Sequence, residues 1–151
     1  MRKISLDRIK RGALRSLVLS SLAKKPMYVY EIIKNIHSET HGFYKPSPGS
    51  IYPVLKSLLK DGLVESFEDN GKRMYKLTEK GIEEFNRIKK EREDFFSSNS
   101  EIKREIVDVL FEIGYLIYIN RENIDSEKLK QINTILQNCK KEVVSLFEKS
   151  K

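Results

Sequence analysis

Apolar side chains recur every three or four positions through most of the chain, the spacing that gathers them on one face of an α-helix. The pattern predicts a helix over residues 6–23, which ends at the Lys-Lys-Pro sequence 24–26 because proline disfavours helical geometry in the preceding residue. It predicts a second helix over residues 28–40, which Gly42 ends. The expected inward positions are Ile9, Leu14, Leu17, Val18, Leu22, Ile32, Ile33 and Ile36.

A third helix is predicted to start at Ser47 and Pro48. The serine hydroxyl can accept a hydrogen bond from a first-turn amide, and proline has no amide hydrogen to leave unpaired. Asp61-Gly62 ends this helix, since glycine adopts the left-handed conformation at no steric cost. The expected buried stripe is Ile51, Val54, Leu55, Leu58 and Leu59.

The pattern then changes to a short hairpin. Leu63 and Val64 begin a strand, the Asp-Asn-Gly sequence 69–71 turns it, and residues 73–77 return it. Three helices followed by a hairpin with a basic tip have the outline of a winged helix-turn-helix, in which the third helix enters the major groove of DNA. This part of the chain therefore predicts a DNA-binding device.

The rest of the chain is predicted to be helical. A highly charged helix from Thr78 to about Phe96 precedes a Ser-rich linker at 97–100, where Ser98 and Glu101 fit a capping box. Two further helices follow, joined by a turn at 120–125. Each has a seam of apolar residues with a seven-residue repeat, as in helices that pack nearly parallel or antiparallel. The seams comprise Ile102, Ile106, Val109, Ile113, Leu116, Leu129, Ile132, Leu136, Cys139, Val143 and Leu146.

These elements predict a mainly α fold with a small two-stranded β-wing. We expect a winged helix-turn-helix DNA-binding domain at residues 1–96 and a C-terminal helical dimerisation region at 97–151. The small N-terminal core cannot cover both seams, so they are expected to meet a second copy of the chain. The predicted dimerisation residues are Ile106, Val109, Ile113, Leu116, Leu129, Ile132, Leu136, Val143 and Leu146.

Charge is distributed unevenly in this 151-residue chain of net charge +7. Residues 1–78 hold 15 Lys and Arg against 7 Asp and Glu, whereas residues 79–151 hold 14 against 15. The excess lies in the half that carries the hairpin, as expected for a surface that meets phosphates, although charge that only keeps the protein in solution is the alternative.

Other functional classes find little support. No apolar run approaches the length of a bilayer span, and the single cysteine cannot form an internal disulfide, so we expect a cytoplasmic protein. His37 and His41 lack the glutamate spacing of a metalloprotease and have no evident third ligand. Cys139 is expected to be a buried seam residue, with a redox sensor as the alternative. We expect no enzyme activity, no cofactor and no metal.

Three segments together resemble the PadR-type transcriptional regulators. They are Tyr-Val-Tyr-Glu-Ile at 28–32, Pro-Ser-Pro-Gly-Ser-Ile-Tyr-Pro-Val-Leu at 46–55 with its Asp-Gly-Leu-Val continuation, and Gly-Lys-Arg-Met-Tyr-Lys-Leu-Thr-Glu-Lys-Gly at 71–81. The resemblance covers roughly residues 12 to 96. Val29 stands where the family commonly has glycine, and the wing is short. The resemblance implies a homodimeric regulator, often a repressor, whose partner is double-stranded DNA.

The DNA contacts expected from the residues and the resemblance lie on the second helix, the third helix and the wing. Ser47 could equally serve only as a cap, Tyr30 could pack into the core, and Lys56 could be a solvated charge. Exposed lysines and arginines at such positions bind phosphates or base edges. The candidates are Tyr30, Lys34, Lys45, Ser47, Ser50, Tyr52, Lys56, Lys72 and Arg73.

The resemblance also implies that a small aromatic effector could bind near a dimer interface. Phe111, Tyr115 and Tyr118 are the candidate lining, because their spacings of four and three bring the rings near one another; filling the dimer core is the alternative. For the chain as a whole, the alternatives to a sequence-specific regulator of a palindromic operator are an architectural DNA-binding protein, a protein–protein module and a hydrolytic enzyme.

Overall fold

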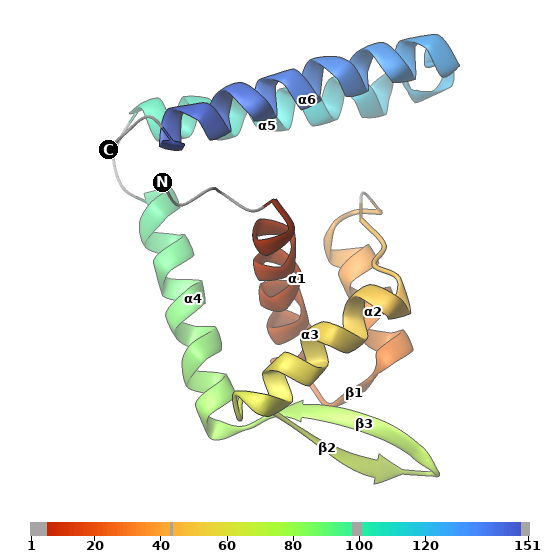
Figure 1. Cartoon of the computed structure of the whole chain (residues 1–151), viewed down its shortest axis with the longest axis vertical. Helices are drawn as coiled ribbons and strands as arrows, with labels where there is room; N and C mark the ends of the chain where they lie inside the picture. Colours follow the sequence, from red (N-terminus) through yellow and green to blue (C-terminus); the bar gives the residue numbers. More distant parts are fainter. Residues whose placement is uncertain (1–5, 43, 98–100, 149–151) are drawn as a thin grey trace. The chain divides into compact units, whose positions relative to one another are not determined.

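The computed structural model describes residues 6–42, 44–97 and 101–148, and it divides into two compact units, Leu6–Phe95 and a unit that begins at Phe96 (Figure 1). Side chains are described from Lys10 onward, so the expected inward position of Ile9 lies outside the described part, as do Ser98 and the side chain of Ile102.

The first unit contains four helices and a small sheet. Its elements are α1 (Leu6–Leu22), β1 (Met27–Tyr28), α2 (Val29–Glu39), α3 (Pro48–Lys60), β2 (Val64–Asp69), β3 (Lys72–Leu77) and α4 (Glu79–Ser97). The antiparallel sheet has the strand order β1-β3-β2, and the β2–β3 ribbon projects beyond the helices as the wing (Figure 1). A mainly α winged helix-turn-helix fold is therefore confirmed.

One detail of the prediction is wrong, because the sheet has three strands and not two. Met27 and Tyr28 pair with Tyr75 and Met74 of β3, so α2 begins at Val29 and not at Tyr28. Two residues are too short a segment to show the alternation of polarity that identifies a strand. Their pairing with a strand almost fifty positions away decides their conformation.

The core lies between α1, α2, α3 and the sheet. Leu14, Val18 and Leu22 of the predicted first stripe are buried, and Leu17 packs against the core. The second helix buries Ile32 and Ile36, with Ile33 at the edge. The third buries Ile51, Val54, Leu55 and Leu58, with Leu59 at the edge. Leu19, Met27, Leu63, Val64 and Tyr75 complete the core.

The start of α4 is fixed closely against the turn after α3. The Thr78 hydroxyl donates to the Gly62 carbonyl at 2.6 Å and accepts from the Gly81 amide at 3.0 Å. A Cβ at Gly81 would lie 1.9 Å from the Leu63 carbonyl oxygen, so only glycine fits here without displacement of the backbone. This close approach sets where the chain leaves the wing.

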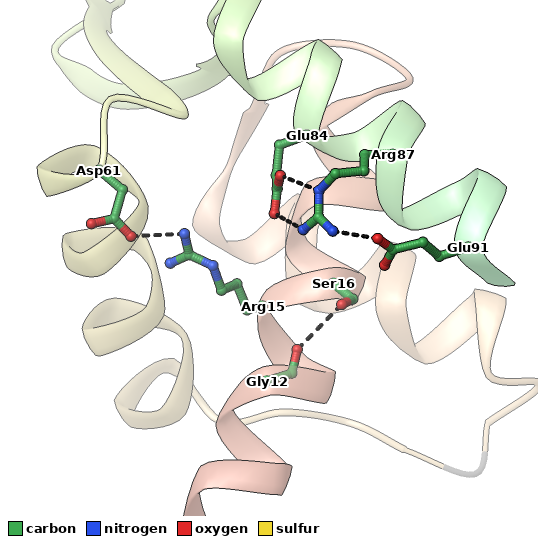
Figure 2. Close-up of polar contacts among 7 residues, drawn as sticks. All are labelled: Gly12, Arg15, Ser16, Asp61, Glu84, Arg87 and Glu91. Carbon is green, nitrogen blue, oxygen red and sulfur yellow. Dashed lines mark hydrogen bonds and ion pairs between the residues drawn. The ribbon is translucent and has the colours of Figure 1, made fainter.

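Polar contacts on the outside of the unit tie α1 to the end of α3 and run along α4 (Figure 2). The Arg15 guanidinium donates to Asp61 at 2.7 Å and to the Ser57 hydroxyl at 3.0 Å. On α4, Arg87 donates to both Glu84 and Glu91, and its hydrogen bonds hold the pKa of the Glu84 carboxyl below its usual value. The Arg15 hydrogen bonds help to fix α3 in place.

The second unit is a pair of helices joined by a short turn (Figure 1). It comprises α5 (Glu101–Ile119), a short 3-10 turn η1 (Arg121–Asn123) and α6 (Ser126–Glu148). Asp125 caps α6 by accepting from the Lys128 amide at 2.8 Å. Among the described residues, no helix is both long and apolar enough to cross a membrane.

Candidate nucleic-acid interface

The first turn of α3 presents polar groups away from the core. The Ser47 hydroxyl accepts from the Ser50 amide at 3.2 Å and lies 2.9 Å from the Ser50 hydroxyl, so Ser47 is the cap that the sequence predicts. Tyr52 and Lys56 are exposed on the side opposite the buried stripe. Hydroxyls and first-turn amides in this arrangement can bind phosphate oxygens.

The start of α2 adds two stacked aromatic rings. Tyr28 precedes the helix, and its amide donates to the Glu31 carboxylate at 2.9 Å. The rings of Tyr28 and Tyr30 are stacked with centroids 5.7 Å apart and planes 9° from parallel. Tyr30 is 62% exposed, which disfavours the alternative that it packs into the core.

The wing carries opposite charges on its two strands. The register places Glu65 opposite Lys76, Glu68 opposite Arg73, and Asp69 opposite Lys72. Glu65 and Lys76 form an ion pair at 2.8 Å. Among the ion pairs of the described residues, none involves Lys72 or Arg73, so both cations at the tip are available to an external anion.

These three elements line one groove of about 600 Å³. Four of the predicted DNA-contact residues border it: Tyr30 from α2, Tyr52 from α3, and Lys72 and Arg73 from the wing. The other lining residues are Tyr28, Val29, Ile33, Pro48 and Tyr75. The groove thus combines two exposed aromatic side chains with the two cations of the wing tip, which suits contact with a nucleic-acid backbone.

The remaining five candidates lie outside this lining. Lys34 is exposed on α2, Lys45 is exposed in the segment before α3, and Lys56 is exposed one turn along α3 from Tyr52. Ser47 and Ser50 are exposed at the start of α3, close in sequence to Pro48 of the groove. The structure therefore brings together a subset of the predicted residues and leaves the others around it.

Comparisons with known proteins support the winged helix-turn-helix fold described above. The sequence pattern of the transcriptional regulator PadR-like family matches residues 18–87. Transcriptional regulator YqjI of Escherichia coli K12 is 29% identical over 148 residues, covering 89% of this chain and 70% of that protein. The uncharacterized protein X of Lysinibacillus sphaericus is 30% identical over 109 residues, covering 69% of this chain and 93% of that protein.

A solved structure of a transcriptional regulator from Clostridium thermocellum superposes with a TM-score of 0.52 at 28% identity, over 70% of this chain and 95% of that one. The chain belongs to the PadR-like family. This membership makes it a DNA-binding transcriptional regulator, a class that is normally non-enzymatic.

The second unit of this PadR-like regulator exposes its apolar seams. Ile106, Val109, Leu116, Leu129, Leu136, Val143 and Leu146 are all at least 40% exposed, while Ile113 and Ile132 are half-buried. Cys139 is exposed and not buried, so its expected burial does not occur within a single chain. A groove of about 490 Å³ runs between α5 and α6 and is lined by Ile113, Leu116, Ile132 and Leu136 among others.

The three aromatic residues proposed for an effector lie elsewhere on the helix pair. Phe111 and Tyr115 are stacked with centroids 6.2 Å apart, and the Arg121 guanidinium lies 4.7 Å from the centre of the Tyr118 ring. All three rings are more than half exposed, and none lines the groove between α5 and α6. Any enclosed pocket around them would need further residues.

Sequence reasoning missed Tyr28 among the residues that line the groove between α2, α3 and the wing. The residue was expected to begin the second helix, and it instead ends a strand, caps α2 and donates its hydroxyl to Asp69 at the end of β2. The available signal was the pair of tyrosines at spacing two, which cannot both lie on one helical face. Among the described residues, no cluster of three or more potential metal ligands occurs.

Proposed function

We propose that this PadR-like protein is a sequence-specific regulator that acts as a homodimer and represses transcription. In this proposal α3 lies in the major groove and the wing lies against the backbone or the minor groove. The observation that carries it is the groove bordered by Tyr30, Tyr52, Lys72 and Arg73, because it joins the start of the recognition helix to the cations of the wing. A surface of that composition suits a polyanion better than a small neutral ligand.

Two kinds of contact with DNA would contribute. Lys72, Arg73, Lys34 and Lys45 would neutralise phosphates and supply salt-dependent affinity without sequence information. Ser50 and Lys56 project from α3, where side chains reach base edges in the major groove. Ser47, which caps the helix, would contribute by fixing the first turn.

The dimer is supported by the exposed seams of α5 and α6. Soluble monomers seldom expose apolar patches of more than a few hundred Å², so a second copy is the natural cover for these faces. Twofold symmetry would present two copies of α3 to DNA about one helical turn apart, roughly 34 Å or a multiple of it, and so favour a palindromic operator. Repression would follow where such an operator overlaps a promoter.

An aromatic effector at Phe111, Tyr115 and Tyr118 is part of the proposal. The stacked pair offers ring faces, and the tyrosine hydroxyls can orient a polar substituent. A compound that favours the DNA-incompetent dimer by about 1–3 kcal/mol would release the operator measurably. A phenolic library screened by thermal shift, followed by DNA-release assays, tests this part.

The main test is selection of bound fragments from the host's genomic DNA, followed by competition with random-sequence duplex. A sequence-specific regulator should enrich a few fragments that share a palindrome and should resist the random competitor. Lys56→Ala should then change the ranking of operator variants, by roughly 1–3 kcal/mol for a good base contact. Equal affinity for selected and random DNA would favour a non-specific architectural protein instead.

A further inference from the structure

We propose that the hydrogen bond from Tyr28 to Asp69, named here the Tyr28–Asp69 latch, is a positioning device for DNA binding. It would hold the wing against the start of α2 and keep the tip cation Lys72 free for phosphate. The proposal deepens the DNA-binding function set out above and rests on it. Tyr28 and Asp69 act in it as positioning residues, without touching DNA themselves.

The latch joins segments that are far apart in the sequence. Tyr28 ends β1, and Asp69 ends β2 on the far side of the central strand β3. The Tyr28 hydroxyl donates a hydrogen bond to the Asp69 carboxylate, and it also lies 3.5 Å from the Asp69 carbonyl. The bond to the carboxylate raises the pKa of the Tyr28 phenol to about 12.

The latch also decides which partner the Asp69 carboxylate has. Asp69 lies directly opposite Lys72 in the ladder, and opposite charges at such positions attract one another. The equivalent pair nearer the base of the wing, Glu65 and Lys76, is closed at 2.8 Å. Tyr28 engages the Asp69 carboxylate, and Lys72 has no ion-pair partner among the described residues.

The same tyrosine connects the wing to the aromatic face of α2. Its ring stacks on Tyr30, and both rings line the groove together with Lys72 and Arg73. A wing held by the latch therefore keeps its two cations in a fixed position relative to Tyr30 and the first turn of α3. Without the latch, the tip of the ribbon would lack this side-chain tie to the helical part of the unit.

Two neutral substitutions of Asp69 distinguish this positioning role from simple repulsion between the Asp69 carboxylate and the DNA phosphates. Asp69→Asn keeps a side-chain oxygen that can accept from Tyr28, whereas Asp69→Ala leaves only the backbone carbonyl, 3.5 Å from the hydroxyl. Both substitutions remove the same negative charge. The probe is a mixed-sequence duplex of about three helical turns, because the phosphate contacts of the wing do not depend on sequence. Affinity is measured over a range of salt concentrations with the full chain.

The latch predicts that Asp69→Ala binds DNA about three- to tenfold more weakly than Asp69→Asn, with a log–log salt slope lower by about 0.9 for each phosphate that the wing no longer neutralises. Tyr28→Phe alone should weaken binding similarly, and in the Tyr28→Phe background the Asn and Ala variants should become equal. Melting temperatures should stay unchanged, which distinguishes positioning of the tip from loss of the fold.

Equal binding of Asp69→Asn and Asp69→Ala, with Tyr28 intact, would overturn the latch and leave charge as the explanation. A Tyr28→Phe variant that binds like the wild type would also overturn it, while the proposed function would stand. Wild-type protein that binds neither this duplex at low salt nor any fragment of the host's genomic DNA would overturn the proposed function, and the latch with it.

Discussion

The two units of the chain use their apolar residues in opposite ways. All 14 buried hydrophobic residues of the described structure lie in the first unit, between Leu14 and Tyr75. The helix pair α5–α6 has none among its described side chains, although its seams are as regular in sequence as the stripes of α1 and α3. The same periodicity therefore leads to burial in one unit and to exposure in the other.

The difference shows what an apolar period does and does not determine. It determines which face of a helix is apolar, but not whether other residues of the same chain bury that face. In the first unit three helices and a sheet enclose a core, whereas two helices alone leave one side of each seam open. The first unit encloses a hydrophobic core of its own, whereas the second exposes the apolar seams that the proposed dimer would cover.

The largest effect is expected from a charge placed on the seam. Val143→Asp would bury an unpaired carboxylate at the proposed dimer interface, which should cost about 3–5 kcal/mol and favour monomers. Asn138→Asp adds the same charge on the opposite side of α6 and should leave assembly unchanged. Sedimentation velocity of both variants measures this, and a dimeric Val143→Asp protein would argue that the seam faces solvent.

Removal of a core side chain should harm the first unit almost as much. Leu19 is fully buried, so Leu19→Ala should lower the free energy of unfolding by about 2–5 kcal/mol in urea. Leu110 on α5 is 66% exposed and lies off the predicted seam, so Leu110→Ala should cost less than about 0.5 kcal/mol. Similar losses at the two sites would remove the contrast between the units.

A smaller effect is expected at the junction of α3, the wing and α4. Gly81→Ala would drive a methyl group into the Leu63 carbonyl and should destabilise the protein by roughly 1–3 kcal/mol. Gly12 in α1 has open space around it, and Gly12→Ala should instead stabilise by about 0.5–1 kcal/mol. Thermal unfolding of the two variants provides the comparison, which fails if both shift the midpoint in the same direction.

The smallest expected effect is on affinity for DNA, which the proposed function attributes to the first unit. Lys72→Ala with Arg73→Ala should flatten the log–log dependence of DNA binding on salt, by about 0.9 for each phosphate that these side chains neutralise in the wild type. Lys130→Ala with Lys141→Ala removes two exposed lysines from α6 and should leave the slope as it was. An unchanged slope for the wing variant would mean that the wing does not touch the backbone.

Much of the fold could be predicted because the pattern is local. The ends of α1 and α3, the cap at Ser47 and the turn of the wing each follow from a few neighbouring residues. Strand β1 could not be predicted, because two residues carry no period and their conformation depends on pairing with β3. Periodicity and turn residues thus sufficed wherever structure is set within one element.

The candidate nucleic-acid interface shows the same difference between features set locally and features set by contacts between distant segments. Basic side chains on the wing and polar ones on α3 could be named from sequence because exposure follows from the helical and strand periods. The latch could not, since it joins Tyr28 to a residue 41 positions later by a hydrogen bond that only the folded sheet creates. For the same reason, the placement of Tyr30 and Tyr52 beside Lys72 and Arg73 became visible only in three dimensions.

Sedimentation equilibrium of the wild-type chain is the most direct test of the proposal that α5 and α6 join two copies of the chain. At micromolar concentration the chain should behave as a dimer, with twice the mass of the 17.7 kDa chain. Addition of an operator duplex should give a complex of two chains for each palindrome. A protein that sediments as a monomer under these conditions, alone and on DNA, would contradict the assignment of α5 and α6 to assembly.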